Sequence, residues 1–183
     1  MRVFLGIPLG DRQKERLSPY LDSLEKLFPS ARWIPLENLH VTVRFFGEFP
    51  PSSLDELTSW ILEKIRTIGS YPVELDTFGY FQRGKRFVFW IGLKNAEWIT
   101  LLAKSLSDTF LGLEAENRRF IPHLTLGRYQ LRNKNIAQFY RFLKEFKNLK
   151  LEVFTQTTFR LILFKSMLGQ EGAKYEELQS WPL

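Results

Sequence analysis

Both histidines of the chain open the same four-residue pattern, in which an apolar residue, a threonine and a second apolar residue follow the histidine. One copy begins at His40 and the other at His123. In a chain with 44% apolar residues, two randomly placed histidines would both carry this pattern with a probability of roughly one in ten thousand. The repeat therefore indicates one structural unit that is used twice.

The elements predicted around the two motifs follow one order, at an offset of about 83 to 85 residues. Apolar periodicity predicts a strand, a helix, the motif strand, a helix and a strand in each half. The predicted segments are 3–9, 11–28, 39–46, 53–68 and 73–78 in the first half, and 87–93, 96–111, 121–128, 134–146 and 149–154 in the second. Asp11 is expected to cap its helix, and Ser53 with Glu56 to form a capping box. A strand at 160–164 and extended chain after a turn at 169–172 would complete the sheets.

This layout predicts an α+β fold with two pseudo-symmetric lobes, each with a mostly antiparallel sheet flanked by helices. At 183 residues, the chain is long enough for one sizeable core, so residues 1–183 are expected to form a single domain. On a strand, residues two apart share a face, which puts His40 beside Thr42 and His123 beside Thr125. A pseudo-two-fold axis would then turn the two motifs into one active site in the cleft between the lobes.

Composition narrows the chemistry that such a site can perform. The chain has no cysteine, which excludes thiol nucleophiles, disulfide scaffolds and zinc–thiolate centres. Lysine and arginine exceed aspartate and glutamate by 26 to 20, and this excess favours polyanionic partners. No apolar run has the length of a membrane span, and the N-terminus does not resemble a signal peptide. We expect a cytoplasmic protein without a membrane partner.

The motif residues themselves are suited to work on a phosphate group. Histidine exchanges a proton near neutral pH, so two facing imidazoles can act as acid and base. A phosphate held between the two strands could accept hydrogen bonds from the hydroxyl groups of Thr42 and Thr125. Such a site would need neither a nucleophilic side chain nor a metal.

Four further side chains are candidates for substrate contacts. Arg44 shares the histidine face of its strand by strict alternation, whereas Arg128 reaches that face only if its strand bulges or twists. Residues 78–86 are predicted to form a hairpin that interleaves aromatic and basic side chains. Tyr80 and Phe81 could stack there on a base, unless the aromatic side chains close the core instead. We expect Arg44, Tyr80 and Phe81 to line the substrate, and Arg128 to join them if its strand bulges or twists.

The sequence resembles the 2H phosphoesterase superfamily and, within it, the LigT-like RNA 2′,3′-cyclic phosphodiesterases. The similarity covers nearly the whole chain, through RWIPLENLH at 32–40, RFFGE at 44–48, PHLTLGR at 122–128 and SWPL at 180–183. It implies a bilobal α+β fold and opening of 2′,3′-cyclic phosphates at RNA ends to 2′-phosphomonoesters, without metal or cofactor. It also implies that His40 is the proton donor to the leaving 3′ oxygen, that His123 is the proton acceptor that activates water, and that Thr42, Thr125 and Arg128 hold the phosphate.

Several alternatives remain open from the residues alone. A nearly symmetric site does not reveal which histidine is the acid. A 2′,5′-oligonucleotide phosphodiesterase or an RNA 2′-5′ ligase-like enzyme would share all four motif residues. A noncatalytic nucleotide-binding module is a third class, and the retention of both histidines argues against it. A two-histidine metal hydrolase would need carboxylates, which neither motif carries. The expected partners are RNA ends or nucleoside 2′,3′-cyclic phosphates, and the protein is expected to be a monomer.

Overall fold

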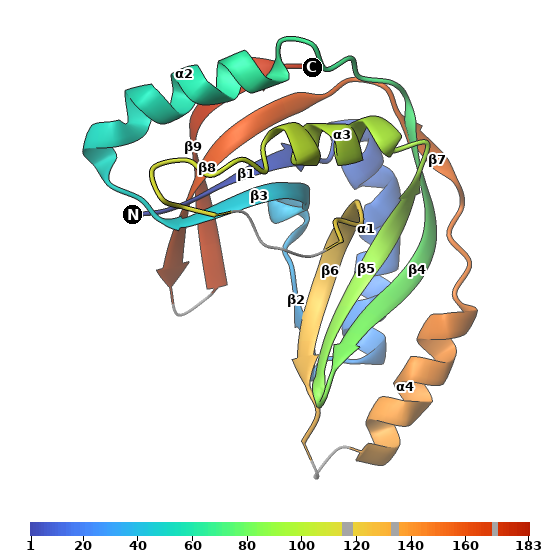
Figure 1. Ribbon diagram of the computed structural model, residues 1–183. Helices are drawn as coiled ribbons and strands as arrows, with labels where there is room; N and C mark the ends of the chain where they lie inside the picture. Colours follow the sequence, from blue (N-terminus) through green and yellow to red (C-terminus); the bar gives the residue numbers. More distant parts are fainter. Residues whose placement is uncertain (115–118, 133–135, 170–171) are drawn as a thin grey trace.

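The computed structural model describes residues 1–114, 119–132, 136–169 and 172–183. Within these ranges nine strands form one sheet in the order β7-β4-β5-β6-β3-β1-β8-β9, with β2 paired to β6 beside this path. All pairings are antiparallel. The sheet bends where β6 meets β3, so its two halves stand at an angle to each other (Figure 1). The predicted α+β class with mostly antiparallel lobes is confirmed.

Strands and helices alternate along most of the chain. The strands are β1 (Arg2–Pro8), β2 (Arg32–Trp33), β3 (His40–Glu48), β4 (Val73–Arg83), β5 (Arg86–Lys94), β6 (His123–Gln130), β7 (Phe154–Gln156), β8 (Arg160–Gly169) and β9 (Gly172–Pro182). The helices are α1 (Asp11–Leu27), α2 (Leu54–Ile65), α3 (Glu97–Ser105) and α4 (Ile136–Asn148), with short 3₁₀ turns η1 (Leu36–Asn38) and η2 (Pro51–Ser53).

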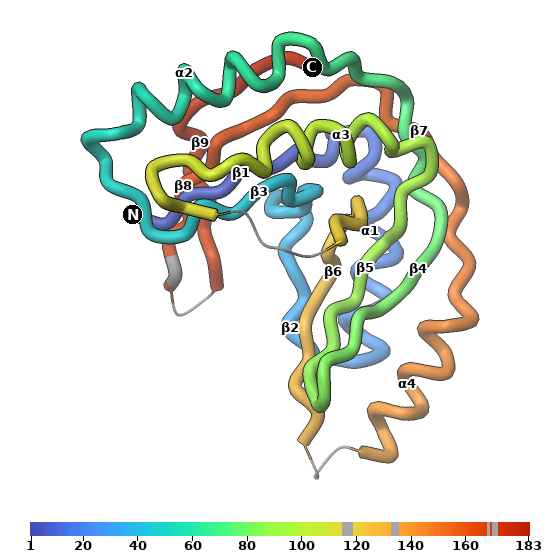
Figure 2. Tube along the Cα trace, viewed as in Figure 1, coloured from blue at the N-terminus to red at the C-terminus, as the bar shows by residue number. Residues whose placement is uncertain are grey.

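The first lobe contains β3, β1, β8 and β9 under helices α2 and α3, and the second contains β6, β5, β4 and β7 with helices α1 and α4. Trp60 of α2 packs on Phe46 of β3, with ring centroids 6.4 Å apart. Phe28, at the end of α1, stacks on Phe142 of α4 at 4.6 Å. Helix α1 therefore lies beside the strands of the second lobe, although it follows β1 in the sequence (Figure 2). The two sequence halves interleave, and neither half forms a lobe alone.

Several predicted boundaries differ from the structure. Helix α3 ends at Ser105 rather than residue 111, because the chain turns there and Leu111 and Gly112 take positive φ angles of 47° and 76°. The strand expected at 149–154 is wrong except at its last residue. The N-cap of α1 is Gly10, so Asp11 stands in the first turn, and no side-chain hydrogen bond caps α2 at Ser53. The predicted helix start at 134 and the turn at 170–171 lie outside the described residues.

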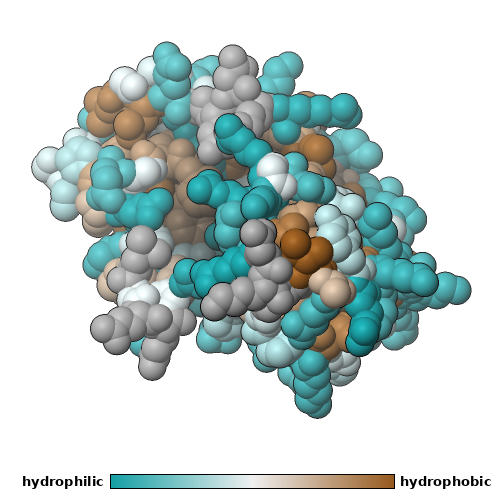
Figure 3. All heavy atoms as spheres, turned by 90° about the horizontal axis from the view of Figure 1, so that it is seen from below, coloured by the Kyte–Doolittle hydropathy of each residue, from teal (hydrophilic) through white to brown (hydrophobic). Residues whose placement is uncertain are grey.

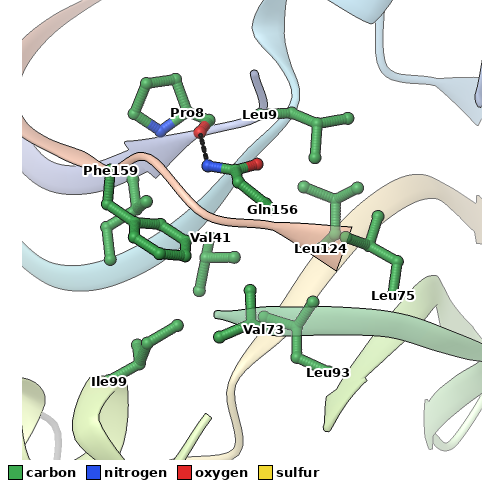
Figure 4. Close-up of a pocket in the computed structure, with 11 residues that line it drawn as sticks. Pro8, Leu9, Val41, Val73, Leu75, Leu93, Ile99, Leu124, Gln156 and Phe159 are labelled. Atoms are coloured by element: carbon green, nitrogen blue, oxygen red, sulfur yellow. Dashed lines mark hydrogen bonds between the residues drawn. The ribbon is translucent and has the colours of Figure 1, made fainter. Parts of the chain in front are cut away.

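One face of the junction between the lobes is filled by the apolar core. Val41 of β3 pairs with Leu124 of β6, and both side chains line a cavity of about 20 Å³ (Figure 4). Gln156 closes one side of it by donating a hydrogen bond to the Pro8 carbonyl at 3.3 Å. Small-molecule sites measure roughly 300 to 1,000 Å³, so this cavity is too small for a nucleotide. The opposite face of β3 and β6, which carries the histidines, is the face open to a ligand.

Within the described residues, helices α1 to α4 pack on the other side of each half-sheet and leave that opposite face without a helix (Figure 1). Viewed from below, the molecule is hollowed, with an apolar floor and a mainly hydrophilic rim (Figure 3). Across the described ranges, no helix is both long and apolar enough to cross a membrane.

Candidate active site

The two histidines stand at the first positions of adjacent strands, β3 and β6. Val41 pairs with Leu124 across the two antiparallel strands, and this geometry places His40 and Thr42 of β3 next to Thr125 and His123 of β6. Because Val41 and Leu124 point into the core, these four neighbours point to the other face. The structure thus brings together the four motif residues around one pseudo-two-fold axis, as the sequence predicts.

Each histidine ring is held through the same atom. Nδ1 of His40 lies 2.7 Å from the carbonyl oxygen of Asn38, and Nδ1 of His123 lies 2.7 Å from that of Ile121. A carbonyl only accepts, so Nδ1 carries the proton in both rings and Nε2 of each faces the site. The hydroxyl of Thr42 lies 3.0 Å from Nε2 of His40 and donates to it when the imidazole is neutral.

Burial lowers the pKa of His40 to about 4, against the hydrogen bond to Asn38, and the positive charge of Arg128 and the neighbouring His123 lower it further. Burial also lowers the pKa of His123, against the bond to Ile121, and Arg128 acts in the same direction. Both imidazoles are therefore neutral at pH 7 in the free protein. A bound phosphate would reverse this effect, since an anion favours the protonated ring.

Matching bulges shape the two motif strands beyond the threonines. Opposite Leu5 and Gly6, the register of β3 skips Val43, and opposite Phe89 and Trp90 the register of β6 skips Leu126. Because each bulge adds one residue to its strand, the residues after the bulge point to the opposite face from the one that strict alternation predicts. Arg128 consequently lies on the histidine face, exposed and close enough to act on both imidazoles. That Arg128 binds phosphate stays a prediction.

The same bulge turns Arg44 away from the site, so its expected place along the substrate is wrong. Its guanidinium is buried and donates to the carbonyl oxygens of Leu106, Asp108 and Leu113, the latter two at 2.8 Å. It also lies over the ring of Phe46, at 4.6 Å. Arg44 thus fixes the chain that follows α3, and its role is structural.

The hairpin of β4 and β5 divides the two aromatic candidates between its faces. Phe81 stands edge-on to the His123 ring at 5.0 Å and 88°, so it does line the site. Tyr80 points the other way and packs on Phe87 at 5.9 Å, beneath Lys147 of α4. The expectation that Tyr80 lines the substrate is wrong, because neighbouring strand residues face opposite sides.

Sequence reasoning missed the aromatic surroundings of His40. The ring centroids of Phe4 and Tyr175 lie 4.9 and 5.3 Å from that of His40, and Phe164 lies at 6.0 Å. Gly6 leaves room for this ring, since a Cβ there would stand 3.0 Å from its Cδ2 atom. A glycine inside an apolar strand signals such a close approach, but the pairing of β8 with β1, which brings the β8–β9 hairpin beside His40, has no local signal.

Asn38 links this aromatic wall to the histidine strand. Its backbone carbonyl holds Nδ1 of His40, and its side-chain amide donates to the carbonyl of Ala173 in β9 at 3.0 Å. One residue thus positions both the imidazole and the β8–β9 hairpin. In the part of the chain that the structure describes, no group of three or more histidine, aspartate or glutamate side chains could hold a metal ion.

The curled antiparallel sheet and the paired His-x-Thr motifs at its bend define the class of two-histidine phosphoesterases. A family model described as the 2′-5′ RNA ligase superfamily matches residues 13–163, and the chain belongs to this superfamily. It is 30% identical over 131 residues to the RNA 2′,3′-cyclic phosphodiesterase of Thermotoga maritima, covering 70% of each chain. It is 26% identical over 186 residues to that of Methanothermobacter thermautotrophicus, covering 100% of this chain and 99% of the relative. The prediction of a phosphodiesterase enzyme is confirmed.

Solved structures share the fold. A protein of Thermus thermophilus matches with a TM-score of 0.74 at 20% identity, over 100% of this chain and 98% of its own. Escherichia coli LigT complexed with 3′-AMP matches with a TM-score of 0.64 at 20% identity, over 100% of this chain and 96% of its own. Both likenesses support the two-lobed architecture.

Proposed function

We propose that the protein hydrolyses 2′,3′-cyclic phosphates at RNA ends to 2′-phosphomonoesters by acid and base catalysis, without a metal ion. The observation that carries this proposal is the arrangement of the two imidazoles, each held by Nδ1 with Nε2 turned to one face. The names of the curated relatives support the same substrate class.

In this mechanism the cyclic phosphate lies between the motif strands, where the hydroxyl groups of Thr42 and Thr125 and the guanidinium of Arg128 hold its oxygens. Displacement at phosphorus puts the attacking and leaving oxygens roughly in line. Nε2 of His123 takes a proton from water as its oxygen bonds to phosphorus. The P–O3′ bond breaks, and Nε2–H of His40 gives its proton to the 3′ oxygen. Exchange with solvent restores the starting protonation.

The acid must carry a proton before the reaction, although both rings are neutral in the free protein. A bound phosphate anion raises the pKa of a nearby imidazole, and the effect is larger where the surroundings screen charge weakly. His40 is enclosed by Phe4, Phe164 and Tyr175. We therefore assign the proton donor to His40 and the proton acceptor to His123.

The test is turnover of nucleoside 2′,3′-cyclic phosphates in the presence of EDTA. We expect the wild-type rate to persist, and His40→Ala and His123→Ala each to lose about 10²- to 10⁴-fold in kcat, the usual contribution of a positioned acid or base. Chromatography of the product should show the 2′-phosphate. Loss of turnover in EDTA, near-normal alanine variants or a 3′-phosphate product would each contradict the mechanism.

The description of the family favours a second activity at the same site. If the 5′-hydroxyl of another RNA replaces water as the nucleophile, the same proton transfers and the same P–O3′ cleavage give a 2′-5′ linkage. Incubation of cyclic-phosphate ends with 5′-hydroxyl RNA at high concentration tests this ligation, and His123→Ala should abolish it together with hydrolysis.

A further inference from the structure

A second arginine stands beside Arg128 on the histidine face. Arg32 of β2 pairs directly with Arg128 of β6, and Trp33 pairs with Gly127. The ring of Trp33 lies over Gly127, where a Cβ would come within 2.6 Å of its Cε3 atom, and it packs towards Phe89 in the core. Since adjacent residues face opposite sides, Arg32 points to the face of Arg128.

Arg32 reaches across the hollow to the other lobe. Its Nη2 atom lies 3.4 Å from the place that a Cβ would occupy on Gly172, the first residue of β9. Burial raises the pKa of Tyr175, also on β9, and the positive charges of Arg128 and Arg32 oppose this rise. The side chain thus spans from β2 to the β8–β9 hairpin, which Asn38 ties to the histidine strand.

The direct pairing of these two arginines does not stabilise the fold. Both are exposed, and like charges directly opposite each other in a sheet are destabilising. Among the residues that the structure describes, no carboxylate forms an ion pair with either one. Two such guanidinium groups side by side fit a ligand with more than one negative charge.

The two groups extend to different parts of the site. The charge of Arg128 acts on both histidines and on Tyr175, whereas the side chain of Arg32 extends to Gly172 at the start of β9. In a single-stranded RNA whose terminal phosphate lies between the histidines, the next phosphate lies one nucleotide away from it. The terminal phosphate would then lie at Arg128, and the next phosphate at Arg32.

We propose that Arg32 binds the phosphodiester that precedes the terminal nucleotide, so that the site prefers an RNA end to a free nucleoside cyclic phosphate. This inference rests on the proposed function and adds a substrate preference to it. The contact is electrostatic and directed, since a guanidinium offers a fork of donors to phosphate oxygens.

The test compares a short oligoribonucleotide that ends in a 2′,3′-cyclic phosphate with the matching nucleoside 2′,3′-cyclic phosphate. Arg32→Ala should lower kcat/KM for the oligonucleotide on the order of tenfold, through KM, and leave the nucleoside substrate within about twofold. The slope of log kcat/KM against log salt should fall by about 0.7 for the oligonucleotide, the value for one phosphate contact in a single strand. Arg32→Lys should restore part of the loss. The matched control is Arg66→Ala, which removes an equal charge from the exposed end of α2.

An equal loss on both substrates, or no loss on either, would overturn the role of Arg32. If the wild-type protein hydrolyses neither substrate, the proposed function is refuted, and equilibrium binding decides the inference separately. In that case Arg32→Ala should still weaken binding of an oligonucleotide with a 2′-phosphate end, and leave binding of the nucleoside 2′-phosphate unchanged. Unchanged oligonucleotide binding would refute the contact.

Discussion

Replacement of Gly6 by alanine tests whether the position of His40 matters more for the reaction than the stability of the sheet. Gly6 lies in β1 opposite Thr42, and its backbone has no unusual conformation that would strain alanine. The added Cβ would stand 3.0 Å from Cδ2 of His40 and 3.4 Å from ring atoms of Phe4 and Phe164. Since the two phenyl rings allow ordinary contact, the imidazole is the group that must move.

The required movement is a few tenths of an ångström, because ordinary carbon contacts begin near 3.5 Å. The His40 ring is restrained by its bond to Asn38 at 2.7 Å and by Thr42 at 3.0 Å, so displacement shifts Nε2 from its working position. A misplacement of about 1 Å costs roughly 10²-fold in rate. We therefore expect Gly6→Ala to lower kcat about tenfold, with about 1 kcal/mol lost in unfolding free energy from overpacking.

The assay is kcat and KM on a nucleoside 2′,3′-cyclic phosphate, together with denaturant unfolding. Gly69→Ala is the control, because its Cβ would meet nothing closer than 3.5 Å, and it should keep the wild-type rate. If Gly6→Ala retains kcat within twofold while its unfolding free energy falls, the imidazole tolerates the shift. The proposed dependence of the reaction on a fixed His40 would then be refuted.

Three further predictions concern Arg44, the protonation of His40 and the two aromatic residues of the β4–β5 hairpin. Arg44→Met should lower the unfolding free energy by about 2–4 kcal/mol, because it leaves buried carbonyls without a donor, while the KM of the folded protein stays unchanged. Burial holds the pKa of His40 at about 4, below its ordinary value near 6.5. The native state thus favours the neutral ring, so this stabilisation is complete above about pH 6.5 and is lost as the pH falls through about 4; His40→Gln should flatten that part of the melting-temperature profile. Phe81→Ala should lower kcat/KM, because its ring supports His123, whereas Tyr80→Ala should lower the melting temperature and leave kcat/KM within about twofold.

Much of the fold could be predicted because the signals are local. The duplicated motifs and the apolar periodicity predict both motif strands, four helices and the antiparallel lobes. Helix ends and short edge strands were less predictable. Helix α3 stops at Ser105 although apolar residues continue at Leu106, Phe110 and Leu111. Leu106 and Phe110 are buried in the turn that follows, whereas Leu111 is exposed.

The misplacement of Arg44, and the position of Arg128 against strict alternation, have one physical source, the bulges of β3 and β6. Strict alternation puts Arg44 on the histidine face and Arg128 on the other, and the extra residues Val43 and Leu126 invert both assignments. Gly127 gives a local signal for the second bulge, since a glycine inside a strand often marks one. In the first bulge the corresponding position is occupied by Arg44, so no glycine marks that bulge in the sequence.

The contributions of Arg32 and Tyr175 were not predictable from local patterns. Arg32 lies beside Arg128 because two residues of β2 pair with β6, and Tyr175 lies beside His40 because β8 pairs with β1 and carries β9 with it. The pairings of β2 with β6 and of β8 with β1 join segments far apart in the sequence. Long-range register depends on the packing of the whole sheet, so the residues around a motif do not specify it.

The two motif strands have the same backbone pattern, including the bulge, but they differ in the side chain that follows the bulge on the histidine face. Arg128 stands on β6 where the pseudo-two-fold axis puts Phe45 on β3, and Phe45 is 52% exposed and lies 5.6 Å from Phe4. A symmetric site would offer a substrate two equal orientations. Phe45 on one strand and Arg128 on the other make the two ends of the site unequal, and under the proposed mechanism this difference favours one orientation, because a base stacks on rings and phosphates bind guanidinium groups. The same asymmetry would then set which ribose oxygen faces His40 and so give the two histidines different parts in the proposed reaction.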